Sequence, residues 1–312
     1  MEIIRGMHNL RDRHHGSVAT IGNFDGVHRG HKALLAELRD RGRALGLPTT
    51  LITFEPQPRD YFRGREVPAR LTRLREKLYL LERVGVDRVL CLPFNEKLAS
   101  MSAQLIIEDL LVGALGVRHL IVGDDFRFGH NREGNFAMLE AAGERFGFQV
   151  GQLDTLALGE ERVSSTRVRQ ALAAGDLVLA EELLGHRYFI SGRVVYGRQL
   201  GRQLGIPTAN IPLKRYRAAL EGVFAVEVSG LDGVVRRGVA NIGVRPTVEG
   251  REPLLEVHLF DFAEDIYGRL LTTSFRHKIR DEWTFDSLDA LKARIGVDIV
   301  AANAFFAAEE TS

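Results

Sequence analysis

Short apolar runs alternate with longer amphipathic stretches along the first half of the chain. The apolar runs have the length of buried strands, and the stretches between them repeat apolar residues at helical spacing. This alternation predicts an α/β domain, in which a parallel sheet is built with right-handed crossovers. The expected strands are 18–21, 50–54, 88–92, 119–122 and 148–153, and the expected helices are 32–45, 72–84, 103–111 and 136–145.

The pattern changes near Gly185, after a helical stretch at 176–184. Short strands separated by turn residues then predict an antiparallel barrel or sandwich, followed by a helical tail at 287–308. We therefore expect two domains, residues 1–185 and residues 186–312, with residues 1–16 as a polar lead-in. The strands expected in the second domain are 189–196, 222–228, 234–240, 254–260 and 272–280.

The stretch Gly22-Asn23-Phe24-Asp25-Gly26-Val27-His28-Arg29-Gly30-His31 lies between the first expected strand and the first expected helix. Its glycines let the backbone approach a ligand closely. Free N–H groups at the helix start and two imidazoles three residues apart suit a phosphate chain. The alternative is a glycine-rich turn with two solvated histidines. The strand-loop-helix context and the His-x-x-His spacing favour the ligand site.

Three further loops follow expected strands, and ligands bind at the carboxyl ends of strands in such sheets. Aromatic residues in loops suit stacking on a flat ligand, although the two phenylalanines of the second loop could equally pack into the core. Hydroxyls at a helix start followed by arginine suit a phosphate, or are ordinary caps. The residues concerned are Phe54, Pro56 and Pro58, then Asp125, Phe126 and Phe128, then Ser165, Thr166 and Arg169.

The second half has a glycine-spaced loop of its own, residues 197–205, which leads into Pro207-Thr208-Ala209-Asn210. Such a loop can place backbone N–H groups around phosphates, and a hydroxyl and an amide can supply oxygen ligands to Mg²⁺. The alternative is a loop capped by Thr208 and Asn210. Downstream, Glu256 and His258 share one face of a strand, and periodicity alone does not say whether that face looks inward.

Composition narrows the class of protein. The 312 residues suffice for two domains, and the net charge of +1 argues against a protein driven to nucleic acid or a membrane surface by bulk charge. No Gly-x-x-x-x-Gly-Lys-Ser/Thr motif occurs, so any ATP chemistry is not of the P-loop kind. Cys91 is the only cysteine, and we expect a soluble cytoplasmic protein without a signal peptide or membrane span.

The 22–31 stretch resembles the His-x-Gly-His signature of nucleotidylyltransferases. Together with Phe-x-Pro-x-Pro, Asp-Phe-x-Phe-Gly and Ser-Ser-Thr-x-x-Arg, it is similar to the adenylyltransferase half of bacterial bifunctional riboflavin kinase / FMN adenylyltransferase. Gln57 departs from this pattern, since many members have histidine there. The second half resembles a riboflavin kinase through Pro-Thr-Ala-Asn (207–210), Val-Ala-Asn-Ile-Gly-x-Arg-Pro-Thr (239–247), Leu-Leu-Glu-Val-His-Leu-Phe-Asp-Phe (254–262) and Ile-Arg-x-Glu-x-x-Phe-x-Ser-Leu (279–288).

The resemblance implies a Rossmann-like nucleotidylyltransferase domain followed by a β-barrel kinase domain with a C-terminal helix. It implies that riboflavin takes the γ-phosphoryl group of ATP to give FMN, which takes AMP from a second ATP to give FAD and pyrophosphate, with Mg²⁺ as cofactor. The implied catalytic residues are His28, His31, Arg169 and Glu256. ATP would contact Gly22, Asn23, Phe24, Asp25, Gly26, Ser165, Thr166, Gly201 and Gly205. FMN would contact Phe54, Pro56, Pro58, Asp125, Phe126 and Phe128, and Mg²⁺ would bind Thr208 and Asn210.

Two other interpretations stay open on the first motif alone. One is a nucleotidylyltransferase for another phosphate ester, and the other is a flavin or nucleotide sensor without turnover. The kinase-like half counts against the first. A base-like carboxylate at Glu256 counts against the second, because binding alone needs no base. The expected ligands are thus riboflavin, FMN, FAD and ATP, with no nucleic acid or membrane partner, and the sequence assigns no oligomeric state.

Overall fold

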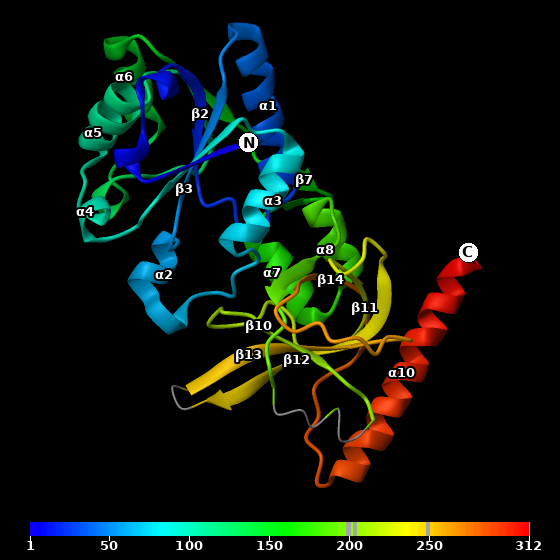
Figure 1. Cartoon of the computed structure of the whole chain (residues 1–312). Coiled ribbons are helices and arrows are strands. Elements are labelled where there is room, and N and C mark those ends of the chain that lie inside the picture. Colours follow the sequence, from blue (N-terminus) through cyan, green and yellow to red (C-terminus); the bar gives the residue numbers. More distant parts are fainter. Residues whose placement is uncertain (198–200, 202–204, 248–249, 312) are drawn as a thin grey trace. The chain divides into compact units, whose positions relative to one another are not determined.

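The computed structural model describes residues 1–197, 201, 205–247 and 250–311. The chain folds into two compact units, drawn in Figure 1. The first unit is Met1–Val67 with Arg73–Ser164, and the second is Pro68–Thr72 with Ser165–Ser312. The units divide near Ser165, whereas the sequence pattern changes near Gly185, and the helices between these points belong to the second unit.

A six-stranded sheet forms the centre of the described first unit, in the order β1-β4-β3-β2-β5-β6. Every neighbouring pair is parallel. Strands β2 and β3 are buried almost throughout, as expected of a parallel sheet covered on both faces. The strands are β1 (Glu2–Arg5), β2 (Ser17–Ile21), β3 (Thr49–Phe54), β4 (Arg88–Leu92), β5 (Val117–Gly123) and β6 (Gln149–Leu153).

Helices connect these strands and confirm the α/β prediction. Helix α1 ends at Gly46, whose left-handed conformation (φ 61°) a glycine adopts without strain. The expected helix at 103–111 is present as α5 and continues, with wider turns, through η4. The longer helical elements are α1 (Arg29–Leu45), α2 (Pro58–Arg63), α3 (Leu74–Val84), α4 (Glu96–Ala99), α5 (Ala103–Leu105), η4 (Ile106–Ala114) and α6 (Phe136–Phe146); a small hairpin, β7 (Ala157–Leu158) and β8 (Glu161–Arg162), follows.

The polar lead-in expected for residues 1–16 is wrong in one respect, because it contains strand β1. This strand pairs with β4, with Glu2 opposite Arg88. Ile4 is buried whereas Ile3 is exposed, so the strand packs only one face, as a short edge strand does. Its few apolar residues lie within a polar stretch, which is why periodicity did not reveal it.

The described strands of the second unit form an antiparallel barrel in the order β10-β13-β12-β11-β14-β9. A bridge between Val195 and Asn210 joins the two ends, so the barrel is nearly closed. The strands are β9 (Phe189–Arg193), β10 (Ala209–Pro212), β11 (Gly222–Ser229), β12 (Arg236–Thr247), β13 (Gly250–Leu259) and β14 (Leu270–Arg280); the helices are α7 (Ser165–Ala174), α8 (Leu177–Leu184) and α10 (Leu288–Glu310).

Strand β10 was missed, and β12 extends beyond the expected 234–240 as far as Thr247. Helix α10 begins after Ser287, whose side chain accepts a hydrogen bond from Ala290 N. Phe306 and Ala302 of this helix pack against Val223 and Val239 of the barrel. Within the described part of the chain, no helix has the length and apolar character needed to span a membrane.

Segment Pro68–Thr72 belongs to the second unit although it comes from the first half of the sequence. Arg215, only 7% exposed, donates hydrogen bonds through Nη1 to Arg70 O at 2.9 Å, Leu71 O at 3.1 Å and Tyr188 Oη at 3.0 Å. Leu71 itself is fully buried. The kinase-like half therefore includes residues that a cut near Gly185 would remove.

Helices α7 and α8 should stabilise the barrel. Helix α8 packs on β14, and Leu183 and Leu184 are fully buried. We expect a fragment 165–312 to unfold at a temperature roughly 10 °C or more above that of a fragment 186–312, because each buried leucine contributes about 2 kcal/mol. Thermal unfolding followed by circular dichroism measures this, with Leu183→Ala in the longer fragment as the control for packing. Equal midpoints for the two fragments would contradict it.

Candidate functional sites

The predicted nucleotide loop lies at the carboxyl end of β2, in the middle of the first unit's sheet. Phe24, Gly26 and Val27 have positive φ angles of 47°, 82° and 42°, so the loop is tightly constrained. Asp25 and His28 are both buried, with exposed fractions of 3% and 6%. The loop is thus a fixed structure rather than a solvated turn.

His28 caps helix α1, and His31 lies in its first turn. His28 Nδ1 accepts a hydrogen bond from His31 N at 3.3 Å, and the two rings stack with centroids 3.6 Å apart. A neutral imidazole that accepts at Nδ1 carries its proton at Nε2. His28 therefore carries an N–H donor beside the helix start, where the helix dipole already favours an anion.

Two buried polar atoms of this loop have no hydrogen-bond partner among the described residues, namely Asn23 Oδ1 and His31 Nδ1. Buried polar atoms normally find a partner, so such a pair in one loop is typical of a ligand site. A side chain at Gly30 would press on the His28 ring, since its Cβ would lie 3.3 Å from that ring. The absence of a side chain at Gly30 thus leaves room for the His28 ring.

Lys77 of α3 is a cation that the sequence pattern did not bring to notice. It is fully buried, and its Nζ lies 3.3 Å from Thr53 Oγ1 at the end of β3. The signal was present, because Lys77 interrupts the apolar face that α3 turns toward the core with Leu80 and Leu81. A buried lysine beside the histidines adds to the positive charge at this edge of the sheet.

The two other first-unit loops begin on neighbouring strands of the same edge. Phe54 ends β3, and its ring contacts that of Phe94 edge-on at 5.8 Å. A cis bond joins Glu55 to Pro56, and Pro58 starts α2. Gln57, where many members of the resembled family have histidine, is buried, and its Nε2 has no partner among the described residues.

The two aromatic residues of loop 123–129 do not both form an exposed stacking surface. Phe128 is buried in the core of the first unit, and Phe126 stacks over it with ring centroids 5.5 Å apart. Asp125 is exposed and accepts a hydrogen bond from Arg162 Nη2 at 2.9 Å. Sequence reasoning missed Arg162, which carries no motif and comes from the small hairpin.

Ser165, Thr166 and Arg169 belong to the second unit, at the start of α7. Arg169 Nε donates to Ala69 O at 2.5 Å within that unit.

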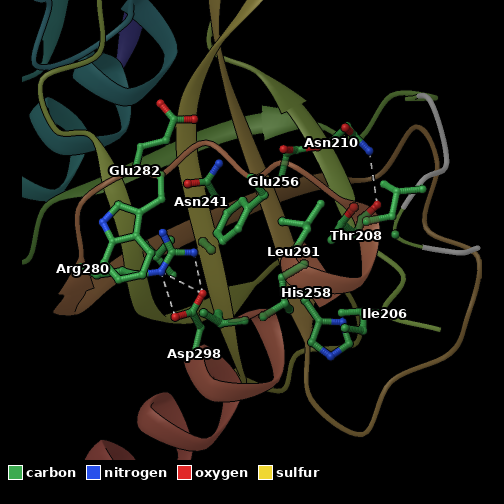
Figure 2. Close-up of a pocket in the computed structure, with 18 of the residues that line it drawn as sticks. Ile206, Thr208, Asn210, Asn241, Glu256, His258, Arg280, Glu282, Leu291 and Asp298 are labelled. Carbon is green, nitrogen blue, oxygen red and sulfur yellow. Dashed lines mark hydrogen bonds and ion pairs between the residues drawn. The ribbon is translucent and has the colours of Figure 1, made fainter. Parts of the chain in front are cut away.

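The second unit contains a cavity of about 580 Å³. Four residues predicted from sequence line it together: Gly201, Thr208, Asn210 and Glu256. Gly205 is a turn residue with φ 78° outside the lining, and Arg198–Leu200 and Arg202–Leu204 of the same loop lie outside the described residues. Figure 2 shows how the labelled side chains surround this cavity.

One row of directly opposite residues crosses the barrel and forms part of the cavity lining. Asn210 of β10 pairs with Glu256 of β13, which pairs with Asn241 of β12. The row continues through Val223 of β11 to Arg280 of β14. The polar face of β13 thus faces the cavity, which α10 also lines, whereas its other face carries the fully buried Leu255 and Val257, and this settles the question that periodicity left open.

The remaining polar groups of the cavity are largely paired with each other. Arg280 makes a bidentate contact with the buried Asp298 of α10, at 2.9 Å from Nε and 2.7 Å from Nη2 (Figure 2). His258 Nδ1 lies 2.9 Å from Pro207 O. Asn210 Nδ2 donates to Thr208 O at 3.3 Å, so the amide nitrogen is turned toward Thr208 and the oxygen Oδ1 away from it.

One wall of the cavity is aromatic and apolar, and it is formed in part by the 279–288 motif, to which the sequence assigned no site residue. Trp283, about half exposed, lies under the guanidinium groups of Arg294 and Arg280, at 4.4 Å and 5.2 Å from the ring centroid. Its neighbours in the lining are Phe285, Leu288, Leu291 and Ile295. This wall suits a flat ring system.

Comparison with known proteins identifies the family. A family model for FAD synthetase matches residues 10–167, and one for riboflavin kinase matches residues 184–306. The chain is 54% identical to the bifunctional riboflavin kinase/FMN adenylyltransferases of Escherichia coli K12 and Pseudomonas fluorescens, and 50% identical to that of Haemophilus influenzae, over 98% of this chain and 98–99% of each relative. The chain belongs to the bifunctional riboflavin kinase/FMN adenylyltransferase family. It has both activities and makes FMN and FAD.

A solved structure described as a macrolide-efflux protein from Streptococcus pneumoniae has the same fold. It superposes with a TM-score of 0.81 at 28% identity, over 97% of this chain and 99% of that one. The efflux role in that description is a statement about the other protein. The family assignment of this chain rests on its more similar relatives and on both family models.

The electrostatics of His31 give a prediction for stability. Burial first, and then the neighbouring basic groups of His28 and Lys77, hold the pKa of His31 well below its usual range. As pH falls below about 6.5, the unfolded chain binds a proton at this position that the folded chain does not, so stability is lost in that window.

We therefore expect wild type to lose more unfolding free energy than His31→Gln between pH 7.5 and 5.5. Urea unfolding at several pH values measures both proteins. Between pH 7.5 and 9 the difference between them should stay constant, which serves as the internal control. Parallel curves across the acid range would show that His31 titrates normally in the folded protein.

Proposed function

We propose that the second-unit cavity binds riboflavin and carries the kinase reaction, and that the 22–31 loop carries adenylyl transfer. The observation behind the kinase assignment is that Thr208, Asn210 and Glu256 meet in one cavity of about 580 Å³. A cavity of this size fits a small-molecule substrate. It joins an apolar aromatic wall to a cluster of oxygen ligands, and riboflavin likewise joins a flat ring to a polar chain.

Glu256 is the proposed general base. The nucleophile is a primary alcohol, which must lose its proton as it attacks the γ-phosphorus of ATP and ADP leaves. A carboxylate within hydrogen-bond reach can accept that proton. Glu256 is the carboxylate in the middle of the lining row, with an asparagine, a neutral side chain, directly opposite it on either neighbouring strand.

Thr208 and Asn210 are the proposed protein ligands of Mg²⁺. Their oxygens are hard donors of the kind that this ion prefers, and it usually keeps waters and substrate phosphates as its other ligands. The described residues contain no group of three or more His, Cys, Asp or Glu side chains that could hold a metal, so an all-protein cage is not the alternative here. When bound, the ion would offset charge on the nucleotide phosphates.

Gly201 and Gly205 belong to the loop proposed to cover the phosphates. A side chain at Gly201 would meet Ile206 O and approach Thr208 Oγ1 to 3.2 Å, so the backbone here lies directly against the proposed metal ligand. Glycine is needed where a backbone approaches so closely. The aromatic wall with Trp283 and Phe285 is proposed to contact the flavin ring.

In adenylyl transfer, an FMN phosphate oxygen attacks the α-phosphorus of ATP and pyrophosphate leaves. The nucleophile is already an anion, so the site needs donors and cations rather than a base. His28, His31 and the start of α1 are proposed to supply them, with Gly22 to Gly26 shaping the loop. Arg169, Ser165 and Thr166 are proposed to add further donors to the phosphates.

Phe54, Pro56, Pro58, Asp125 and Phe126 are proposed to contact FMN. Phe128 supports this surface from below, because its ring is buried under that of Phe126. Riboflavin, FMN and ATP are the substrates, and no nucleic-acid partner is proposed. The single, buried Cys91 fits a reducing compartment, and we propose the cytoplasm.

Changing His28 to alanine should abolish FAD formation and leave FMN formation nearly intact. Loss of one transition-state donor typically costs about 10²–10³ in rate. Riboflavin, ATP and Mg²⁺ are supplied, and both products are separated by chromatography. The matched control is His8→Ala, which removes an exposed imidazole far from the loop in sequence. An equal fall in both products would refute the assignment of His28 to one reaction.

Changing Glu256 to glutamine keeps the size of the side chain but removes the base. We expect the kinase kcat to fall by about 10²–10⁴, as for the loss of a positioned base. Riboflavin binding, measured by fluorescence quenching, should persist, and FAD production from supplied FMN should be unchanged. Wild-type kinase turnover in this variant would show that Glu256 is not the base.

A further inference from the structure

The polar group next to Glu256 on the side away from Asn210 is Asn241, and no role follows for it from the motifs. It lies on β12, directly opposite Glu256 of β13, and it lines the cavity. The other polar groups of the row already have roles. Asn210 is a proposed metal ligand, Glu256 is the proposed base, and Arg280 forms an ion pair with Asp298. Asn241 therefore stands where a substrate chain would pass between the base and the apolar wall.

Glu282 fixes the orientation of the Asn241 amide. The Glu282 carboxyl group lies against Gly243, two residues along β12 from Asn241, and the Asn241 amide lowers the pKa of Glu282. An ionised carboxylate only accepts hydrogen bonds, so the Asn241 NH₂ group must face it. The amide carbonyl, Oδ1, then faces away from Glu282 and is left as an acceptor. Figure 2 shows Asn241 between the labelled side chains of Glu282 and Glu256.

The place of Glu282 depends on a glycine of the same strand as Asn241. Gly243 follows Asn241 by two positions, so both residues lie on one face of β12. A Cβ at Gly243 would collide with the Glu282 carboxyl group. The missing side chain thus creates the space from which Glu282 reaches Asn241. This arrangement of three residues is specific, since each of them is needed for the contact.

Among the described residues, no direct ion pair neutralises the charge of Glu282. Partial burial raises the pKa of Glu282, and the carboxylates Glu221 and Glu256 raise it further, while the Asn241 amide and Arg280 lower it. Arg280 is already bound to Asp298. The amide of Asn241 is consequently the neutral donor that holds Glu282 beside the cavity.

We propose that Asn241 Oδ1 accepts a hydrogen bond from a secondary hydroxyl of the riboflavin side chain, and that Glu282 is the positioning residue that keeps this acceptor turned toward the substrate. The pair selects a polyhydroxylated chain over a plain alkyl alcohol. This inference rests on the proposed assignment of the cavity to riboflavin. It adds a determinant of substrate specificity that is separate from the base.

The test compares two substrates in the full-length enzyme. One is riboflavin, and the other is a flavin whose side chain keeps only the terminal hydroxyl. For Asn241→Ala we expect the KM for riboflavin to rise about five- to tenfold, as for the loss of one neutral hydrogen bond, with kcat within about twofold. The KM for the analogue should be the same in wild type and variant, because the analogue has no secondary hydroxyl that could donate to Asn241.

Glu282→Gln is the second variant, since glutamine keeps the shape but lets the Asn241 amide flip. We expect a riboflavin KM increase of about two- to fivefold and again no change with the analogue. Asn303→Ala, at an exposed amide on the same chain outside the cavity lining, is the control and should match wild type with both substrates. A KM increase of equal size for both substrates, an unchanged KM for riboflavin, or a fall in kcat alone would each overturn the proposal.

Trp283→Ala separates this inference from the assignment of the cavity itself. If the cavity binds flavin, this variant should weaken the binding of riboflavin and of the analogue alike, as fluorescence quenching measures. Weaker binding in Trp283→Ala with no effect of Asn241→Ala overturns the role of Asn241 alone. No effect of either variant on flavin binding overturns the assignment of the cavity and the inference together.

Discussion

Strand register determines which side chains line the second-unit cavity. Because side chains alternate between faces along a strand, a slip of one residue in β13 would turn Glu256 away from the cavity and Leu255 toward it. The pairing of Asn210 with Glu256, and of Glu256 with Asn241, fixes one polar row on the barrel face that lines the cavity. The buried residues Leu255 and Val257 hold this register by packing on the opposite face. Hydrophobic burial on one face of β13 thus places the chemistry on the other.

In the first unit, a different constraint brings the predicted site residues together. In a parallel sheet every carboxyl end lies at one edge, so loops that are distant in sequence converge wherever their strands are neighbours. Strands β3, β2 and β5 are adjacent, and the loops containing Phe54, His28 and Asp125 follow them. Here backbone topology, rather than the pairing of single residues, brings the predicted residues to a common edge.

The sequence was sufficient for the fold class and for most elements, because their signal is the periodicity of many residues. It was insufficient for β1 and β10, which are short and contain few apolar positions. The motif residues of the kinase half could be found singly, and the structure brings Thr208, Asn210 and Glu256 to one cavity. Asn241 and Glu282 were missed as a pair because their contact depends on Gly243 and on strands distant in sequence.

The two proposed sites differ in charge in the way that their nucleophiles require. An alcohol must lose a proton, and the barrel places carboxylates and amides around the proposed point of attack. A phosphate ester has no proton to lose and is repelled by carboxylates, and the loop at β2 presents two stacked imidazoles with a buried lysine nearby. A carboxylate that assists the first reaction would oppose the second. Two chemically opposite reactions on one chain therefore need separate pockets, and the proposed sites accordingly lie one on the antiparallel barrel and one on the parallel sheet.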